Sequence, residues 1–346
     1  MAKQEERESR DGDDLWLDRW ARMLGFGWVA DQLPWDLPVS YVYGIVVVTV
    51  PNLATAAYNL HAGVPLLYQQ NPYYLLEPVL LLAAVYGART LSADYDRVMS
   101  EMAIAERTSD PDRLLSPIPD RLPWGLFIVA LVIQYIPTPV WATWGLAGYV
   151  DNLIVLPWLF TPIVVQFFIV YLSIEFIAPW RLANSDVGIH FLDPQGVGGL
   201  RPLGELIKRA YYFVVVGLVG YALITYAPLV PGWTTSGAAN VVFTVLWVLT
   251  VATVGFAVYT LHRFMHREKR GEIQRLESRL RALLENPWQV GDYRVPDGNQ
   301  EEVSDLRERI NQVAATKEYP ATFSIWSQLL VSIALPKAAQ LVIAGV

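Results

Sequence analysis

Apolar runs of about 20 residues, separated by clusters of charged residues, constrain this chain more than any other feature. A helix rises 1.5 Å per residue, so about 20 residues cross a hydrocarbon core of roughly 30 Å. Of the 346 residues, 53% are hydrophobic and only 17% are charged. A soluble domain rarely reaches that balance, because charged surface has to cover its core. The sequence therefore predicts an all-α, polytopic membrane protein in the cell membrane.

Seven segments are apolar enough to be crossings. They lie at 42–61, 73–85, 124–148, 153–178, 210–230, 239–261 and 323–344. The second is short unless it continues through Arg89, whose guanidinium would then extend to the membrane interface. Tryptophans and tyrosines mark many of the segment ends, which is typical of an interfacial aromatic belt.

The basic residues divide sharply between the connections. The N-terminal segment and the connections after the second, fourth and sixth segments hold 25 of the 26 lysines and arginines, whereas 62–71, 149–152 and 231–237 hold none. Because basic residues favour cytoplasmic connections, this alternation predicts seven transmembrane helices, a cytoplasmic N-terminus and an extracellular C-terminus.

The chain is thereby divided into four parts: 1–39, 40–266, 267–319 and 320–346. The first contains "LWLDRWARMLGFGWV" at 15–29, an interfacial amphipathic helix or a helix packed on the cytoplasmic ends of the bundle. The second holds six transmembrane helices, and the third is a cytoplasmic helical region. The fourth is the seventh transmembrane helix.

The cytoplasmic helical region carries two apolar stripes at helical spacing. Their members are Ile273, Leu276, Leu280 and Leu283, then Val303, Leu306, Ile310 and Val313. The stripes predict a hairpin of two helices that bury one another or neighbouring subunits. We expect self-association into a homo-oligomer.

Two further motifs lie on the cytoplasmic side. In 190–205, Asp193-Pro194 and three nearby glycines indicate tight turns, with an anion site as the alternative. His262 and His266 have the i, i+4 spacing that suits zinc, but at this boundary an interfacial role is favoured. We expect no metal and no cofactor.

The composition excludes several functions. There is no cysteine, so disulfides and thiolate chemistry are excluded. No group of catalytic side chains can be placed on one side of the membrane, so we expect the protein not to be an enzyme. We also expect no nucleic-acid partner. The formal charge of −7, with 21 arginines against five lysines, is typical of proteins from salt-loving archaea.

Polar residues inside apolar segments are candidate functional residues, because they are costly in hydrocarbon. The candidates for a ligand cavity are Asn59, Glu77, Gln134 and Gln166. The candidates for a pore or gate are Gln328, Ser332, Lys337 and Gln340. Hydrogen bonding between helices is the alternative for each, and an extension of the side chain to the outer headgroups is the alternative for Lys337.

In the last segment, Thr322 and Phe323 are followed after four residues by Gln328 and Leu329. Gustatory receptors carry a Thr-Tyr pair, five apolar residues and Gln-Phe in their last helix. With its short external connections and large cytoplasmic ones, the whole chain resembles the insect odorant and gustatory receptors and their distant seven-transmembrane relatives. The resemblance implies a cytoplasmic anchor region that joins four subunits, and a central cation pore lined by the last helix.

Three functions are therefore expected. The first is a receptor-like, homo-oligomeric ion channel gated by a small-molecule ligand, with the last helix near the central axis. The second is a non-conducting sensor or signalling scaffold, and the third is a transporter. They differ in whether the protein forms an oligomer and whether that oligomer conducts ions.

Overall fold

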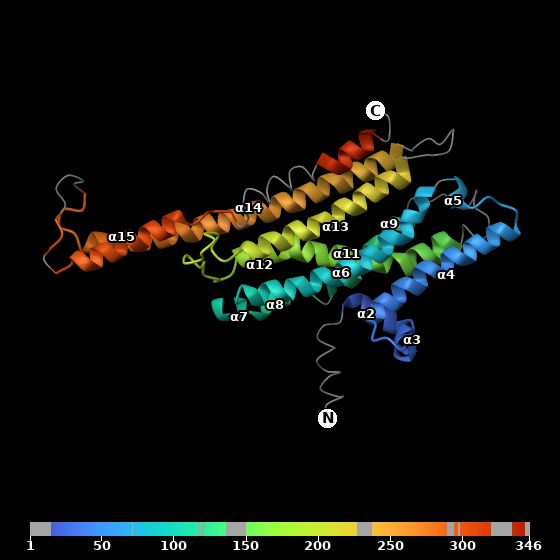
Figure 1. Cartoon of the computed structure of the whole chain (residues 1–346), viewed down its shortest axis with the longest axis horizontal. Helices are drawn as coiled ribbons and strands as arrows, with labels where there is room; N and C mark the ends of the chain where they lie inside the picture. Colours follow the sequence, from blue (N-terminus) through green and yellow to red (C-terminus); the bar gives the residue numbers. More distant parts are fainter. Residues whose placement is uncertain are drawn as a thin grey trace, which may run out of the picture.

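The computed structural model describes residues 15–70, 72–116, 118–119, 121–135, 150–226, 237–288, 294–296, 298–319 and 334–342. Every regular element within these ranges is helical, apart from one isolated bridge between Glu285 and Arg294. The expected all-α class is thus confirmed. Figure 1 shows an elongated molecule, with a bundle at one end and a long helical hairpin, here called the stalk, at the other.

Among the described residues, five helices are long and apolar enough to cross a membrane. Four of them are α4 (Val39–His61), α6 (Leu76–Glu101) with the short η1 (Pro72–Leu75) before it, α13 (Arg201–Tyr226) and α14 (Gly237–Ala282). The fifth is a continuous run of η3 (Asp151–Phe160), α11 (Thr161–Leu172), η4 (Ser173–Ile177) and α12 (Ala178–Ala183).

The third and seventh expected segments lie partly outside the described residues. For the third, the structure describes α9 (Arg121–Tyr135), which is apolar but shorter. For the seventh it describes a helix at 334–342. Seven crossings therefore remain a prediction.

The second segment is longer than its apolar run indicated. Helix α6 has 26 residues and continues through Arg89 to Glu101. Both Arg89 and Asp94 lie in this extension, and each is paired with a side chain of another helix. The expected continuation through Arg89 is thus confirmed, and the Arg89 guanidinium is paired with Asp18.

The fourth segment is one continuous helical run with two π-helical stretches, at η3 and η4. Pro157 lies inside η3 and Pro162 follows at the start of α11. Proline has no N–H and its ring clashes with the preceding turn, so the helix widens instead of continuing as a regular α-helix.

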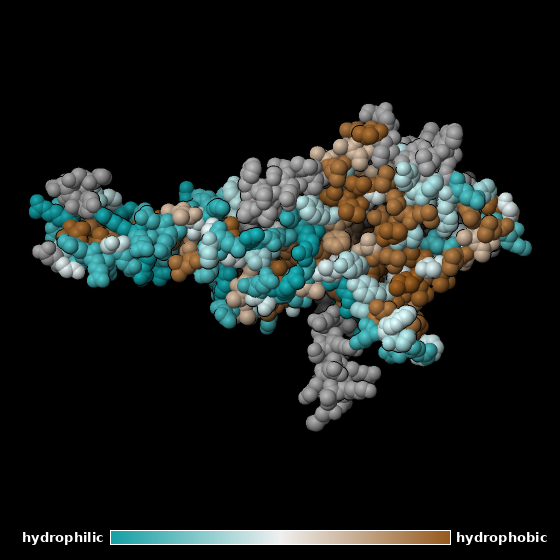
Figure 2. Space-filling view, in the orientation of Figure 1, coloured by the Kyte–Doolittle hydropathy of each residue, from teal (hydrophilic) through white to brown (hydrophobic). Residues whose placement is uncertain are grey.

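Helix α6 is central to the bundle and packs against α4, α11 and α13. The core has two main parts. One lies between α6, α11, α12, α13 and α14, and the other between α2, α4, α6, α9 and α11. Figure 2 shows that the exposed apolar surface covers the bundle, whereas the stalk is mostly hydrophilic.

The N-terminal segment 15–29 forms α2 (Trp16–Met23) and α3 (Phe26–Gln32). Trp16 and Trp20 of α2 are buried in an aromatic cluster with Phe127 of α9. Helix α2 is therefore packed on the bundle, the second of the two expected arrangements. Trp28 and Trp35, each 68% exposed, leave apolar surface beside it.

Helix α14 continues beyond the bundle and pairs with α15 (Gln300–Ala315) to form the stalk. At 1.5 Å per residue, its 46 residues extend over about 70 Å. The two apolar stripes meet, with Leu276, Leu306 and Val313 buried between the helices. The expected hairpin is confirmed, and these stripes bury one another.

The shorter helices connect the longer ones. Helix α5 (Leu67–Gln70) precedes η1, and α7 (Ile104–Arg107) and α8 (Asp112–Leu115) lie between α6 and α9. Ile104 and Leu114 are buried in the larger core cluster. The connection between α6 and α9 is therefore packed on the bundle rather than extended away from it.

The close approach of α6 and α13 requires glycine. A Cβ at Gly87 would lie 2.9 Å from the Phe213 ring, closer than real contacts allow.

We expect Gly87→Ala to destabilise the protein by about 1–3 kcal/mol, because the ring has to move within a packed core. Thermal unfolding in detergent measures the effect. Gly217→Ala is the matched control, since a Cβ there meets no atom within 4 Å. Equal unfolding midpoints for the two variants would contradict this packing.

Candidate functional site

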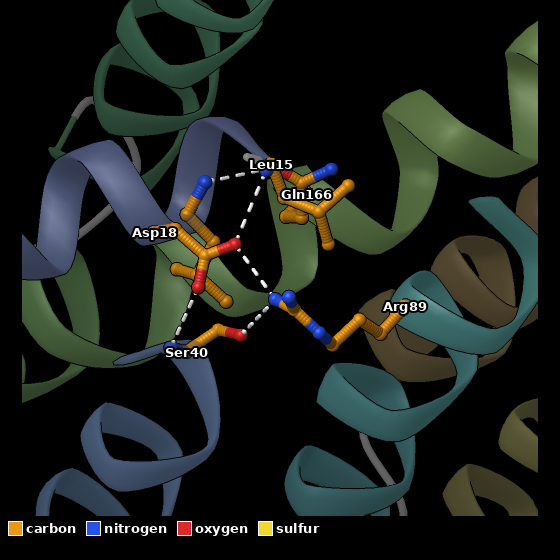
Figure 3. A network of polar contacts seen from close by, with 6 residues as sticks. Leu15, Asp18, Ser40, Arg89 and Gln166 are labelled. Atoms are coloured by element: carbon orange, nitrogen blue, oxygen red, sulfur yellow. Dashed lines mark hydrogen bonds and ion pairs between the residues drawn. The ribbon is translucent and has the colours of Figure 1, made fainter. Parts of the chain in front are cut away.

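A buried carboxylate joins three helices at one end of the bundle. Asp18 of α2 is 1% exposed, and the Arg89 guanidinium of α6 donates through Nη1 to its Oδ2 at 2.7 Å. The same nitrogen donates to Ser40 Oγ of α4 at 3.0 Å. Figure 3 shows that Asp18, Arg89 and Ser40 contact one another in pairs.

Asp18 also caps the first turns of two helices. Its Oδ2 accepts from Leu15 N–H at 3.1 Å, ahead of α2, and its Oδ1 accepts from Ser40 N–H at 2.8 Å, in the first turn of α4. The first N–H groups of a helix have no partner within it, and negative charge is favoured at that end. One carboxylate therefore fixes the relative positions of α2 and α4.

Gln166, a ligand-cavity candidate, belongs to the same network. It lies on α11, is 1% exposed, and accepts through Oε1 from Leu17 N–H at 3.0 Å. Helix α2 is thus attached to α11 as well as to α4 and α6 (Figure 3).

A cavity of about 510 Å³ adjoins this network. It lies between α2, α6, α11 and the connection from α8 to α9. Arg19, Arg89 and Gln166 line it together with apolar residues such as Ile169 and Ile174. The cavity thus combines basic and amide groups with an aliphatic wall.

Glu77 lies at a different place. It lines an apolar groove of about 450 Å³ between α6, α11 and α13, whose walls include Phe167 and Phe213. Asn59, near the end of α4, lines neither hollow. The side chain of Gln134 on α9 lies outside the described residues. The structure therefore does not bring Glu77, Asn59 and Gln166 into one cavity.

Two of the four pore candidates contact α14. Lys337 Nζ donates to Gln340 Oε1 at 2.6 Å and to Thr244 Oγ1 at 3.4 Å. Gln340 is 6% exposed, and its Nε2 donates to Asn240 Oδ1 at 3.2 Å. These contacts attach the helix at 334–342 to α14. Gln328 and Ser332 lie outside the described residues.

Sequence reasoning missed the partners of a second buried carboxyl group. Glu175 of η4 is fully buried, and its Oε2 lies 3.1 Å from the Tyr171 hydroxyl. That hydroxyl lies 2.7 Å from Thr253 Oγ1 on α14, whereas Glu175 Oε1 has no hydrogen-bond partner among the described residues. The position of Glu175 near a segment end was visible in the sequence, but its neighbours on α14 were not.

The two histidines at the boundary are engaged with Glu318. His266 Nδ1 lies 2.9 Å from Glu318 Oε2, and His262 Nδ1 lies 3.0 Å from the Glu318 backbone oxygen. Lys269 Nζ lies 3.5 Å from Glu318 Oε1. Within the described ranges, no three His, Cys, Asp or Glu side chains are placed to hold a metal.

The glycine-containing loop satisfies its own donors. The Asp193 carboxylate accepts N–H groups from Gln195, Val197 and Gly199. Partial burial acts to raise the pKa of Asp193, but these three donors outweigh it and hold the pKa below its ordinary value. A bound anion would have to displace this carboxylate, so the geometry favours a structural turn.

No protein-family model, curated protein or solved structure matches this chain.

The Asp18–Arg89 pair can be tested by substitution. We expect Asp18→Asn to lower the free energy of unfolding by about 3 kcal/mol, because it leaves the Arg89 charge unpaired beside a buried network. Adding Arg89→Gln should recover part of the loss, since contacting residues are coupled. Thermal unfolding in detergent measures both. Asp31→Asn, at an exposed position of α3, is the control. If the double variant lost as much stability as the two single variants together, the pairing would be contradicted.

The Glu318 contacts make stability depend on acid. The hydrogen bond with His266 is the main cause that lowers the pKa of Glu318 from 4.5. The ionised Glu318 carboxylate therefore stabilises the folded protein at pH values above 4.5. That stabilisation is lost as the pH falls through the lowered pKa of Glu318. We expect Glu318→Gln to cost ~0.5 kcal/mol near pH 7, since the pair is partly solvated, and progressively less as the pH falls below 4.5. Unfolding midpoints between pH 3 and 7 measure this. Exposed Glu106→Gln should cost nothing at either pH, and a pH-independent effect of Glu318→Gln would contradict the assignment.

Proposed function

We propose that this chain is an integral membrane protein of receptor type. It crosses the cell membrane seven times, with a cytoplasmic N-terminus and an extracellular C-terminus. Two features support this proposal: five described helices are long and apolar enough to cross, and 25 of 26 basic residues fall in alternate connections.

The observation that carries the receptor role is the continuity of α14. One helix of 46 residues runs from the bundle into the stalk without interruption. In the bundle, Thr253 of α14 contacts the Tyr171–Glu175 pair. At the other end, Leu276 of α14 packs against Leu306 of α15. A tilt or rotation of α14 in the membrane would therefore displace the stalk in the cytoplasm.

Within this class, the first mechanism is a homo-oligomeric channel gated by a small-molecule ligand. The helix at 334–342 supports it, because the helix lies at the edge of the bundle beside α14 (Figure 1). Its exposed positions share one face: Ala334, Leu335, Ala338, Leu341 and Val342. This face can contact another subunit in an oligomer, which by the resemblance to odorant and gustatory receptors would be a tetramer.

A non-conducting sensor is the second candidate, and a specific observation favours it. Lys337 and Gln340 form hydrogen bonds with residues of α14 rather than occupying the exposed face. A pore lined by that face would have aliphatic walls along this stretch. In the sensor, the stalk alone would pass the signal to the cytoplasm.

Oligomeric state and conductance test both mechanisms. The purified chain is sized in detergent by light scattering and reconstituted into planar bilayers. An oligomer with discrete current steps supports the channel, and a silent oligomer supports the sensor. A monomer without conductance would overturn the channel. Substrate-driven uptake into proteoliposomes would instead support the transporter alternative.

Two substitutions on the same helix test which face lies near an axis. We expect Lys337→Gln to lower the free energy of unfolding by ~1 kcal/mol through the lost bonds to Gln340 and Thr244, without changing ion preference. Ala338→Gln, on the exposed face, should change the conductance or the subunit number. Current–voltage curves and light scattering measure these effects. Altered rectification in Lys337→Gln alone would place Lys337 in the pore.

A further inference from the structure

Several hydrogen-bond donors that line the cavity beside the Asp18 network have no acceptor among the described residues. Gln166 is 1% exposed and lines the cavity, yet its Nε2 has no acceptor among the described residues. Arg89 uses Nη1 for Asp18 and Ser40, while its Nε and Nη2 have no acceptor within the same residues. Ser92 also lines the cavity, and its hydroxyl forms no hydrogen bond with the described part of the chain.

A fourth donor is buried at the same place. Trp16 lines the cavity, is 3% exposed, and its Nε1–H has no hydrogen-bond partner in the described structure. Buried donors are rarely left without acceptors, because an unsatisfied polar group is costly. The Gln166 amide of α11 and the Arg89 guanidinium of α6 thus keep N–H groups that no described residue accepts, and Figure 3 shows these two side chains next to each other.

The charges and the walls narrow the class of ligand. Arg19 and Arg89 line the cavity with one carboxylate, Asp96, and Asp18 pairs with Arg89 beside it, so the site offers guanidinium donors while its formal charges balance. Ile169, Val170 and Ile174 form an aliphatic wall on the α11 side. A volume of about 510 Å³ holds a phosphate with a short glycerol-like body, and arginine suits phosphate oxygens particularly well.

We propose that this cavity binds a phosphate oxyanion carried on an apolar body, held by Arg89, Gln166, Ser92 and Arg19. The inner-leaflet headgroup of an anionic lipid has this chemistry, and so does a soluble phosphate ester. The bound anion stabilises α2 against the bundle, because its contacts come from α2, α6 and α11 together. This inference is independent of whether the protein conducts ions.

The experiment uses the full chain in an uncharged maltoside detergent. It is titrated with short-chain phosphatidylglycerol, with phosphatidylcholine of the same chain length, and with inorganic phosphate. Thermal unfolding gives the affinity, and native mass spectrometry counts the lipids retained. We expect phosphatidylglycerol to raise the unfolding midpoint and one molecule to be retained.

The variants separate this site from general lipid binding. We expect Arg19→Gln to weaken binding about tenfold and Ser92→Ala about threefold, as one charged and one neutral donor are lost. Arg22→Gln is the matched control, because Arg22 lies on the same helix but lines a different hollow. Its binding should equal that of the unsubstituted chain.

Each outcome decides the proposal. If inorganic phosphate alone stabilises the protein as well as phosphatidylglycerol does, the site is confirmed and its ligand is a soluble phosphate. If phosphatidylglycerol and phosphatidylcholine stabilise it equally, the apolar wall alone binds and the oxyanion site is wrong. Equal affinities for Arg19→Gln and Arg22→Gln would also overturn it.

Discussion

Polar groups buried among apolar helices have to find their partners within the protein, and Asp18 shows how this constraint positions whole helices. Its carboxylate is almost fully buried and is satisfied by the Arg89 guanidinium and by the first N–H groups around α2 and α4. An unpaired charge at this position would be strongly destabilising. The position of α2 on the bundle, and the cavity that α2 helps to form, both depend on this ion pair.

The same constraint connects the bundle to the stalk. On the fourth apolar segment, the Tyr171 hydroxyl contacts both Glu175 and Thr253 of α14. Gln340 donates a hydrogen bond to Asn240, near the start of α14. Helix α14 then leaves the apolar part of the molecule as one continuous helix. The polar contacts therefore gather on the helix that extends furthest. In the receptor proposed above, this arrangement would couple events in the membrane to the stalk.

Much of the helical architecture could be predicted from the sequence, because hydropathy and helical spacing are local properties. The first, fifth and sixth apolar segments correspond to α4, α13 and α14, and the stripes around Leu276 and Leu306 correctly predicted the hairpin. The expected continuation of the second segment through Arg89 is confirmed, but its ion pairs with other helices, at Arg89 and Asp94, could not be read from the sequence. The site was predicted less well. Gln166 was chosen as polar within an apolar run, but its partner at Leu17 lies 149 positions away.

By itself, the sequence determined that the chain is helical, that several helices suit a membrane, and that its basic residues occupy alternate connections. These properties depend on each residue and its near neighbours along the chain. The tertiary structure alone decided that Asp18 pairs with Arg89, that Glu77 and Gln166 lie in separate hollows, and that Lys337 contacts α14. Pairing between distant side chains depends on how whole helices pack, and packing is a property of many weak contacts that no single sequence motif encodes.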